Sequence, residues 1–248
     1  MKERLDAALA GKGLFPSREK AKAAVMAGAV YVDGIRADKP GTPVSGESEL
    51  TVKEKACPYV SRGGLKLAKA LSEYEIDLSG AHCMDIGAST GGFTDCMLKS
   101  GAAAVHAVDV GYGQLDWKLR SDDRVVVLEK TNIRHMDTEP FTEYFDFIAI
   151  DVSFISLKLV LPAASAMLKP SGGLVCLAKP QFEAGRGQVG KKGIVRDKAV
   201  HREVISKVTG YGEENGLKCR GVTESPITGA KGNVEFLMLF NVHCVEKT

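Results

Sequence analysis

The stretch HCMDIGASTGGFTDCMLKS, residues 82–100, sets the expectation for the fold. It begins with a short and mostly apolar strand, residues 82–88, which contains Asp85. Its second half, residues 92–100, has the pattern of a helix. Between the two lies a turn of small residues, which lets backbone approach a ligand closely. A strand, a glycine-rich turn and a helix in this order are typical of the first unit of a doubly wound α/β domain.

Strands and helices continue to alternate after this stretch. Apolar runs predict strands at 103–111, 124–130, 145–153 and 172–180, and two late strands at 219–226 and 233–243. Helices are expected at 157–170 and near 198–215. This alternation predicts an α/β, Rossmann-like domain, a doubly wound and mostly parallel sheet.

The first fifty residues differ from the rest and predict a small α+β unit. Leu5, Ala8 and Leu9 share one helical face, Ser17 can cap a second helix, and residues 29–34 form a strand that ends in a tight turn. With its stretch SREKAKAAVMAGAVYVDG, this unit resembles the S4 RNA-binding module. We therefore expect an S4-like domain at 1–55, a linker and leading helix at 56–80, and the large domain at 81–248.

Composition restricts the function classes. The 248 residues carry a net charge of +2, and no apolar run approaches the roughly 20 residues that span a bilayer. The N-terminus mixes charges into its apolar positions, unlike a secretory signal, and the six cysteines show no CxxC pairing. We expect a cytoplasmic protein with reduced thiols, no metal site and no membrane contact.

Basic residues gather in two segments of this nearly neutral chain. Residues 53–69 hold five basic side chains against one acid, and residues 179–202 hold seven against two. Such clusters favour a polyanion as partner, although lysine-rich loops are common on any surface. Together with the S4 resemblance, they make these residues candidates for RNA binding: Arg18, Lys20, Lys22, Arg36, Arg62, Arg186, Lys191 and Lys192.

The turn after the strand at 82–88 distinguishes two cofactors. It lacks the GxGxxG spacing of dinucleotide folds, and Asp85 would sit poorly beside a pyrophosphate. A carboxylate there suits a cationic ammonium, as in methyltransferases that use S-adenosylmethionine. Asp109 ends the next strand, where it could hold the ribose of either cofactor. The expected S-adenosylmethionine site comprises Asp85, Gly87, Ala88, Ser89, Thr90, Gly91, Gly92, Asp109, Asn132 and Asp151.

Four charged residues are expected to converge on the same edge of the sheet. Asp151 and Lys179 each follow an apolar strand, Glu235 interrupts the last one, and Lys66 opens the leading helix. Charges rarely enter such positions without a partner. Their order resembles the K-D-K-E tetrad of the FtsJ-like ribose 2′-O-methyltransferases.

Longer stretches resemble one branch of that superfamily, the TlyA family, also named hemolysin A. They are YVSRGGLKL, DIGASTGGFTDCML, DVGYGQLDWKLR, AIDVSFISL and KPQFE, with SPITGAKGN before the last strand. The resemblance covers nearly the whole chain and implies 2′-O-methylation of cytidine ribose in ribosomal RNA, with ribosomal RNA or ribosomal subunits as the partner. It implies that Lys66, Asp151, Lys179 and Glu235 are catalytic. Phe154 and Phe182 could border the acceptor pocket or stack on a flipped base.

Two other classes of protein remain alternatives. The family's second name suggests a cytolysin, although the sequence has neither a spanning helix nor a long basic amphipathic one. A non-catalytic RNA-binding assembly factor would be expected to have lost part of the cofactor turn or the tetrad, and both are intact.

Overall fold

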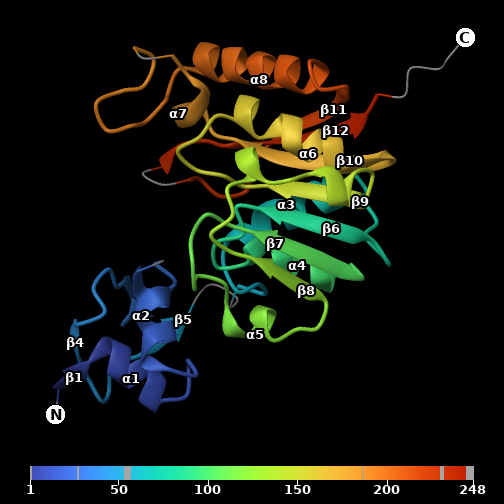
Figure 1. Ribbon diagram of the computed structural model, residues 1–248. Helices are drawn as coiled ribbons and strands as arrows, with labels where there is room; N and C mark the ends of the chain where they lie inside the picture. Colours follow the sequence, from blue (N-terminus) through green and yellow to red (C-terminus); the bar gives the residue numbers. More distant parts are fainter. Residues whose placement is uncertain (1, 27, 53–56, 186, 230–231, 244–248) are drawn as a thin grey trace, which may run out of the picture. The chain divides into compact units, whose positions relative to one another are not determined.

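The computed structural model describes residues 2–26, 28–52, 57–185, 187–229 and 232–243. The chain divides into two compact units, residues 1–58 and 59–248, each with its own buried core (Figure 1). Each unit is described by itself below.

The small unit is an α+β fold built around two short helices. Leu5, Ala8 and Leu9 are buried against Ala21 and Val25, which is the helical pattern that the sequence predicts. Ser17 Oγ accepts a hydrogen bond from the Lys20 N–H (3.3 Å) and so caps the second helix. The elements are β1 (Lys2–Arg4), α1 (Leu5–Gly11), α2 (Arg18–Met26), β2 (Val30–Val32), β3 (Ile35–Arg36), β4 (Pro43–Ser45) and β5 (Leu50–Val52).

The large unit contains a seven-stranded sheet in the order β11-β12-β10-β9-β6-β7-β8. The five strands from β10 to β8 are parallel, and β12 runs antiparallel to both of its neighbours. The doubly wound, mostly parallel sheet predicted from the sequence is therefore present. Its strands are β6 (His82–Ile86), β7 (Ala104–Val108), β8 (Val125–Leu128), β9 (Phe145–Ile150), β10 (Leu168–Ala178), β11 (Leu217–Glu224) and β12 (Phe236–Val242).

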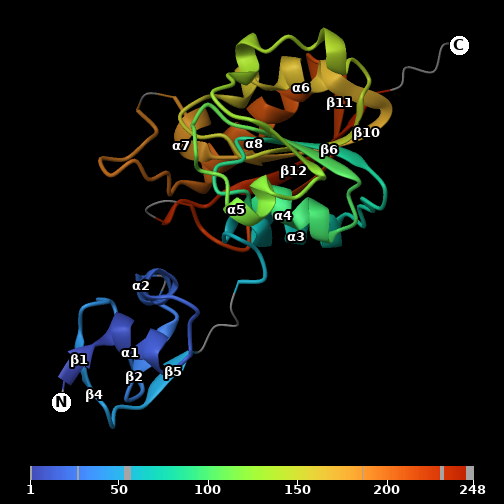
Figure 2. The same cartoon turned by 60° about the horizontal axis from the view of Figure 1, so that its bottom comes forward.

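Helices cover both faces of this sheet (Figure 2). One face is packed by α3 (Gly63–Glu73), α4 (Gly92–Lys99) and α5 (Trp117–Arg120), and the other by α6 (Leu161–Met167) and α8 (Lys198–Glu213). Cys83, Cys96 and Cys176 are buried free thiols in these cores. The remaining elements are α7 (Pro180–Glu183) and three 3₁₀ turns: η1 (Ile133–His135), η2 (Glu139–Phe141) and η3 (Leu157–Leu159).

The helix predicted at 157–170 is shorter than expected. It is divided into η3 and α6, and β10 begins at Leu168 rather than at residue 172. Pro170 explains the difference, because proline cannot continue a helix and disfavours helical geometry in the residue before it. Among the helices described, none combines the length and apolar character needed to cross a membrane.

The strand order positions the site. β6 lies between β9 and β7, so the chain leaves β6 toward β7 and β8 on one side and later adds β9 and β10 on the other. Open α/β sheets bind ligands in the crevice where the order reverses, beyond the carboxyl ends of the strands. The glycine-rich turn after β6 and the strand ends at Asp151 and Lys179 all lie at this edge.

Candidate active site

A cavity of about 620 Å³ opens at this edge of the sheet. Its wall is formed by the turn after β6, the start of α3, the ends of β9 and β10, and the segment before β12. All four residues of the predicted tetrad line it, together with Asp85 and most of the glycine-rich turn. Residues far apart in the sequence therefore meet in one concave site.

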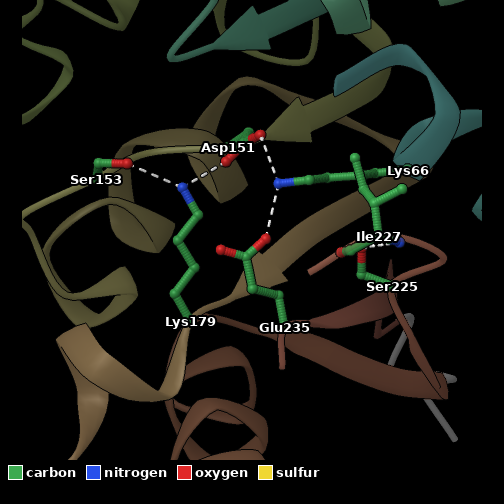
Figure 3. A network of polar contacts seen from close by, with 7 residues as sticks. All are labelled: Lys66, Asp151, Ser153, Lys179, Ser225, Ile227 and Glu235. Carbon is green, nitrogen blue, oxygen red and sulfur yellow. Dashed lines mark hydrogen bonds and ion pairs between the residues drawn. The ribbon is translucent and has the colours of Figure 1, made fainter. Parts of the chain in front are cut away.

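The four tetrad side chains form one alternating chain of charges (Figure 3). Lys66 Nζ lies 2.7 Å from Glu235 Oε2 and 3.6 Å from Asp151 Oδ2. Lys179 Nζ lies 2.5 Å from Asp151 Oδ1 and donates a hydrogen bond to Ser153 Oγ at 3.0 Å. The exposed fractions of the Lys66, Lys179 and Glu235 side chains are 11%, 8% and 3%. Removing one member would leave a buried charge without its partner.

The sheet explains why Glu235 and Lys179 lie at the same edge of the site. β12 is antiparallel to β10, so the start of β12 lies beside the end of β10, with Phe236 paired to Ala178. Glu235 and Lys179 are the next residues outward on each strand. Lys66 reaches the same point from the first turns of α3, and its burial shows that this lysine is no solvent-facing helix residue.

Asp85 is the most deeply buried carboxylate of the site. Its Oδ2 accepts hydrogen bonds from the Thr94 N–H (2.8 Å) and hydroxyl (2.6 Å), and its Oδ1 is buried and has no hydrogen-bond partner among the described residues. Burial raises the pKa of Asp85 to about 7, against the opposing effect of the Thr94 hydrogen bonds. An unpaired buried carboxylate oxygen at a cavity fits a cationic group of a ligand, such as an ammonium.

The turn after β6 brings backbone close to the cavity. Gly87 has φ 89°, and a Cβ there would lie 2.6 Å from the Asp151 carbonyl oxygen, so only glycine lets the two strand ends approach. Gly92 lies under Ser61 and the Gly64 N–H, where a Cβ would also overlap. Gly87, Ala88, Ser89, Thr90 and Gly92 line the cavity, whereas Gly91 faces Leu115 and Leu119.

Two residues predicted for the cofactor have local structural partners. Asp109 accepts hydrogen bonds from the N–H groups of Ser89 and Gly111, both at 2.7 Å, and so holds the turn after β6. Asn132 is exposed and caps η1 through its side-chain oxygen. Neither residue is among those that line the cavity.

The predicted RNA-binding residues are distributed over both units. Arg18, Lys20, Lys22 and Arg36 are exposed on α2 and β3 of the small unit, where Arg18 pairs with Asp6 at 3.4 Å and Arg36 with Asp38 at 3.5 Å. In the large unit, Arg62 lines the cavity, and Lys191 and Lys192 are exposed in a loop. Arg186 lies outside the described residues.

Sequence reasoning missed two polar residues of the site. Ser153 accepts the Lys179 hydrogen bond, and Thr94 donates both of the hydrogen bonds to Asp85. The available signal in the sequence was a hydroxyl residue at the end of a predicted strand, or in the first turn of a predicted helix. It is weak, because serine and threonine are common at such positions for local reasons.

Comparison with protein families places both units. The model of the FtsJ-like methyltransferase family matches residues 59–242, and that of the S4 domain matches residues 3–50. The 16S/23S rRNA (cytidine-2′-O)-methyltransferase TlyA of Mycobacterium tuberculosis is 46% identical over 95% of this chain and 88% of its own length.

Solved structures agree with this placement. A hemolysin candidate from Streptococcus thermophilus is 50% identical, superposes with a TM-score of 0.76, and is matched over 96% of this chain and 88% of its own. A geranyl diphosphate methyltransferase in complex with S-adenosylmethionine shares only the fold, at 15% identity and a TM-score of 0.52, over 72% of this chain and 85% of its own.

Proposed function

This chain belongs to the FtsJ-like methyltransferase family, and on that premise we propose that it methylates 2′-hydroxyls of cytidine ribose in ribosomal RNA, with S-adenosylmethionine as the methyl donor. The observation that carries the proposal is the convergence of Lys66, Asp151, Lys179 and Glu235 beside the turn after β6, in one cavity. A ribosomal substrate implies that the protein works in the cytoplasm.

The residues present fit the cofactor. When bound, S-adenosylmethionine supplies a methyl group on a sulfonium centre. Asp85 Oδ1, which is buried and has no partner in the described part of the chain, would accept its ammonium, and the turn from Gly87 to Gly92 would follow its methionine part. In this assignment Asp109 holds the ribose hydroxyls, Asn132 contacts the adenine ring, and Asp151 lies near the sulfonium.

Lys179 is assigned the role beside the acceptor hydroxyl. A ribose hydroxyl is a weak acid and a poor nucleophile, so it must be oriented and must lose its proton as the new carbon–oxygen bond forms. Lys179 would take that proton when neutral, or stabilise the oxygen's developing charge when protonated. Asp151 and Ser153 hold its Nζ on two sides, which fixes the direction in which it points.

Lys66 and Glu235 complete the charge network. Lys66 bridges Glu235 and Asp151, so the position of Asp151 depends on both. We assign Lys66 and Glu235 to positioning the ribose and to holding Asp151 where it contacts Lys179. Buried pairs of this kind are costly to keep and are strongly destabilising to break singly, which suits a network retained for geometry.

The S4-like residues 1–55 are assigned to holding RNA and residues 81–248 to methyl transfer. Residues 56–80 join them and also supply Lys66 to the tetrad. Arg18, Lys20, Lys22 and Arg36 would contact the RNA backbone from the small unit. Arg62 would do so at the cavity and Lys191 and Lys192 from their exposed loop, and Arg186 is included on sequence grounds alone. Phosphate contacts of this kind supply affinity without sequence information.

The direct test is chemical identification of the product. The purified protein is incubated with methyl-labelled S-adenosylmethionine and unmodified ribosomal subunits, and the RNA is digested to nucleosides. Label in 2′-O-methylcytidine is the expected result. Label confined to base-methylated nucleosides, or no label with any ribosomal substrate, would contradict the proposed reaction.

A further inference from the structure

Glu183 is a buried carboxylate outside the tetrad. It ends α7, the short helix that follows Lys179, and the residue is 9% exposed. Its Oε2 accepts a hydrogen bond from the Ser156 hydroxyl and its Oε1 accepts one from the Leu157 N–H, both at 2.7 Å. Burial raises the pKa of Glu183, and these hydrogen bonds oppose that shift. Burying a carboxylate costs free energy, so its presence here indicates that Glu183 has a function.

Both partners of Glu183 belong to the loop that carries Asp151. This loop, residues 151–157, leaves β9 at Asp151 and contains Ser153 and Phe154 before it enters η3. Phe154 has φ 63°, in the left-handed region that bulky side chains avoid. The residue is 91% exposed and lines the cavity, and its ring centre lies 5.1 Å from that of Phe182.

A strained conformation of this kind persists only where its surroundings hold it on both sides. At its start, the Asp151 N–H donates to the Ile86 carbonyl at 3.0 Å. At its end, Glu183 holds Ser156 and Leu157. Between the two anchors, Ser153 and Asp151 contact Lys179 Nζ. The segment 179–183, which comprises Lys179 and α7, therefore contacts the loop near its start through Lys179 and at its end through Glu183.

We propose that Glu183 is a positioning residue for methyl transfer: it fixes the loop 151–157 so that Asp151 and Ser153 meet Lys179 and Phe154 faces the cavity. This inference rests on the proposed function and adds to it a residue that contacts no reacting atom. Its effect on the reaction passes through Ser156 and Leu157 to the loop.

Three substitutions separate this role from a general contribution to stability. Glu183→Ala removes both anchors. Glu183→Gln can keep both hydrogen bonds, with the direction of one reversed. Its amide oxygen can accept from the Leu157 N–H, while its amide N–H donates to the Ser156 oxygen. Asp146→Ala is the matched control: Asp146 also accepts from a backbone N–H, that of His82 (2.9 Å), and from a side chain, Lys169 (2.7 Å), but at the opposite end of β9.

The experiment measures kcat and KM for ribosomal subunits, cofactor affinity by calorimetry, and Tm for the full-length protein and each variant. Glu183→Ala is expected to lower kcat about 10- to 100-fold, with KM and cofactor affinity within about threefold of the wild type, since small misplacements at a reacting centre cost this much. Glu183→Gln should recover most of the kcat. Asp146→Ala should lower Tm and leave kcat unchanged.

Several outcomes would overturn the inference. They are a folded Glu183→Ala variant with kcat within twofold of the wild type, a Glu183→Gln variant as impaired as Glu183→Ala, or an equal loss of kcat in Asp146→Ala. If Glu183→Ala does not fold, Ser156→Ala, which removes one anchor, must lower kcat severalfold for the inference to stand. An inactive wild type would overturn the proposed function as well, whereas an active wild type with an equally active Glu183→Ala overturns this inference alone.

Discussion

At the scale of single residues, Lys179 is the side chain on which the proposed chemistry depends most directly. Lys179→Ala should lower methyl transfer about 10²–10⁴-fold, the usual contribution of a positioned acid–base group. Lys179→Arg should also fail, because arginine does not release its proton and occupies a different shape. Cofactor affinity should stay near wild type, and the variant should still fold but melt at a lower temperature, because Asp151 loses its nearest partner and keeps Lys66. Calorimetry and thermal melts would check both.

Lys191→Ala is the control for this pair, because it removes a lysine of the nearby exposed loop. It should alter RNA binding modestly and leave turnover at saturating RNA unchanged. A fully active Lys179→Ala variant, or one that merely unfolds, would show that the lysine is structural.

Asp85 should make cofactor binding depend on pH. Its pKa of about 7 in the free protein means that most of these carboxyls are protonated at pH 6, and only the ionised form attracts an ammonium. Affinity for S-adenosylmethionine should therefore be roughly tenfold weaker at pH 6 than its plateau value. Calorimetry between pH 6 and 7.5 measures this, and Asp85→Asn should bind weakly with little pH dependence over that range.

The same shift has an opposite consequence for stability. Because the pKa of Asp85 in the fold lies above its ordinary value of 3.8, the protonated group stabilises the fold at low pH. That contribution is lost as the pH rises toward 7. Asp85→Asn, whose amide oxygen can still accept from Thr94, should therefore melt at a higher temperature than the wild type at pH 7.5. A lower melting temperature there would contradict the burial argument.

Sequence patterns predicted some site residues better than others. Asp151 and Lys179 could be found because each ends an apolar strand, and the carboxyl ends of parallel strands meet at one edge. Glu183 and Ser153 could not, because their partners depend on how two loops fold toward each other. Asn132 resembled a cofactor ligand in sequence, but its described contact is a local cap on η1.

At the scale of elements, the segment between β11 and β12 delivers Glu235 to the cavity. Gly229 lies directly against the Glu235 carboxylate, so that a Cβ at position 229 would overlap Oε1. The Gly229 N–H donates to the Asn233 carbonyl at 2.8 Å, which leaves the backbone little freedom to withdraw. Absence of a side chain at 229 is thus part of the geometry of the Lys66–Glu235 pair.

Gly229→Ala should displace Glu235 from Lys66 and lower methyl transfer about 10- to 100-fold. Cofactor affinity should change little, because Asp85 and the turn after β6 lie on other elements. Gly210→Ala, in α8, is the control, since a Cβ there meets no atom of the described residues within 4 Å. Wild-type turnover in Gly229→Ala would show that Glu235 tolerates the shift and that its position is not critical.

Periodicity predicted the elements more reliably than their ends. The parallel strands were visible as apolar runs because both of their faces are buried. The division of residues 157–170 into η3, α6 and the start of β10 was missed, because Pro170 acts against an otherwise helical pattern. Met26 is apolar and follows Val25 in α2, yet it is 68% exposed, because it lies off the face that Ala21 and Val25 bury.

At the scale of the whole molecule, the two units with separate cores suggest that RNA binding and methyl transfer belong to different units. A chain of residues 57–248 retains the complete tetrad, the turn after β6 and both cores of the large unit. It should bind S-adenosylmethionine like the full chain and lose most of its activity on ribosomal subunits. Undiminished turnover on subunits would contradict the assignment of RNA binding to the small unit.

The salt dependence of RNA binding tests the same division of function between the two units. Each phosphate contact releases counterions, so affinity of the full chain for ribosomal RNA should fall steeply as salt rises. The slope of log K against log salt should be smaller for residues 57–248, because Arg18, Lys20, Lys22 and Arg36 are absent. Equal slopes would place the phosphate contacts in the large unit alone.

The most direct test of the central claim is a map of 2′-O-methyl groups on ribosomal RNA from the source organism. The map is compared between cells with the gene, without it, and complemented with the wild type or Lys179→Ala. We expect one or more methylated cytidines to disappear on deletion and to return only with the wild type. An unchanged map after deletion, or full restoration by Lys179→Ala, would contradict 2′-O-methylation of ribosomal RNA at the site built around Lys179.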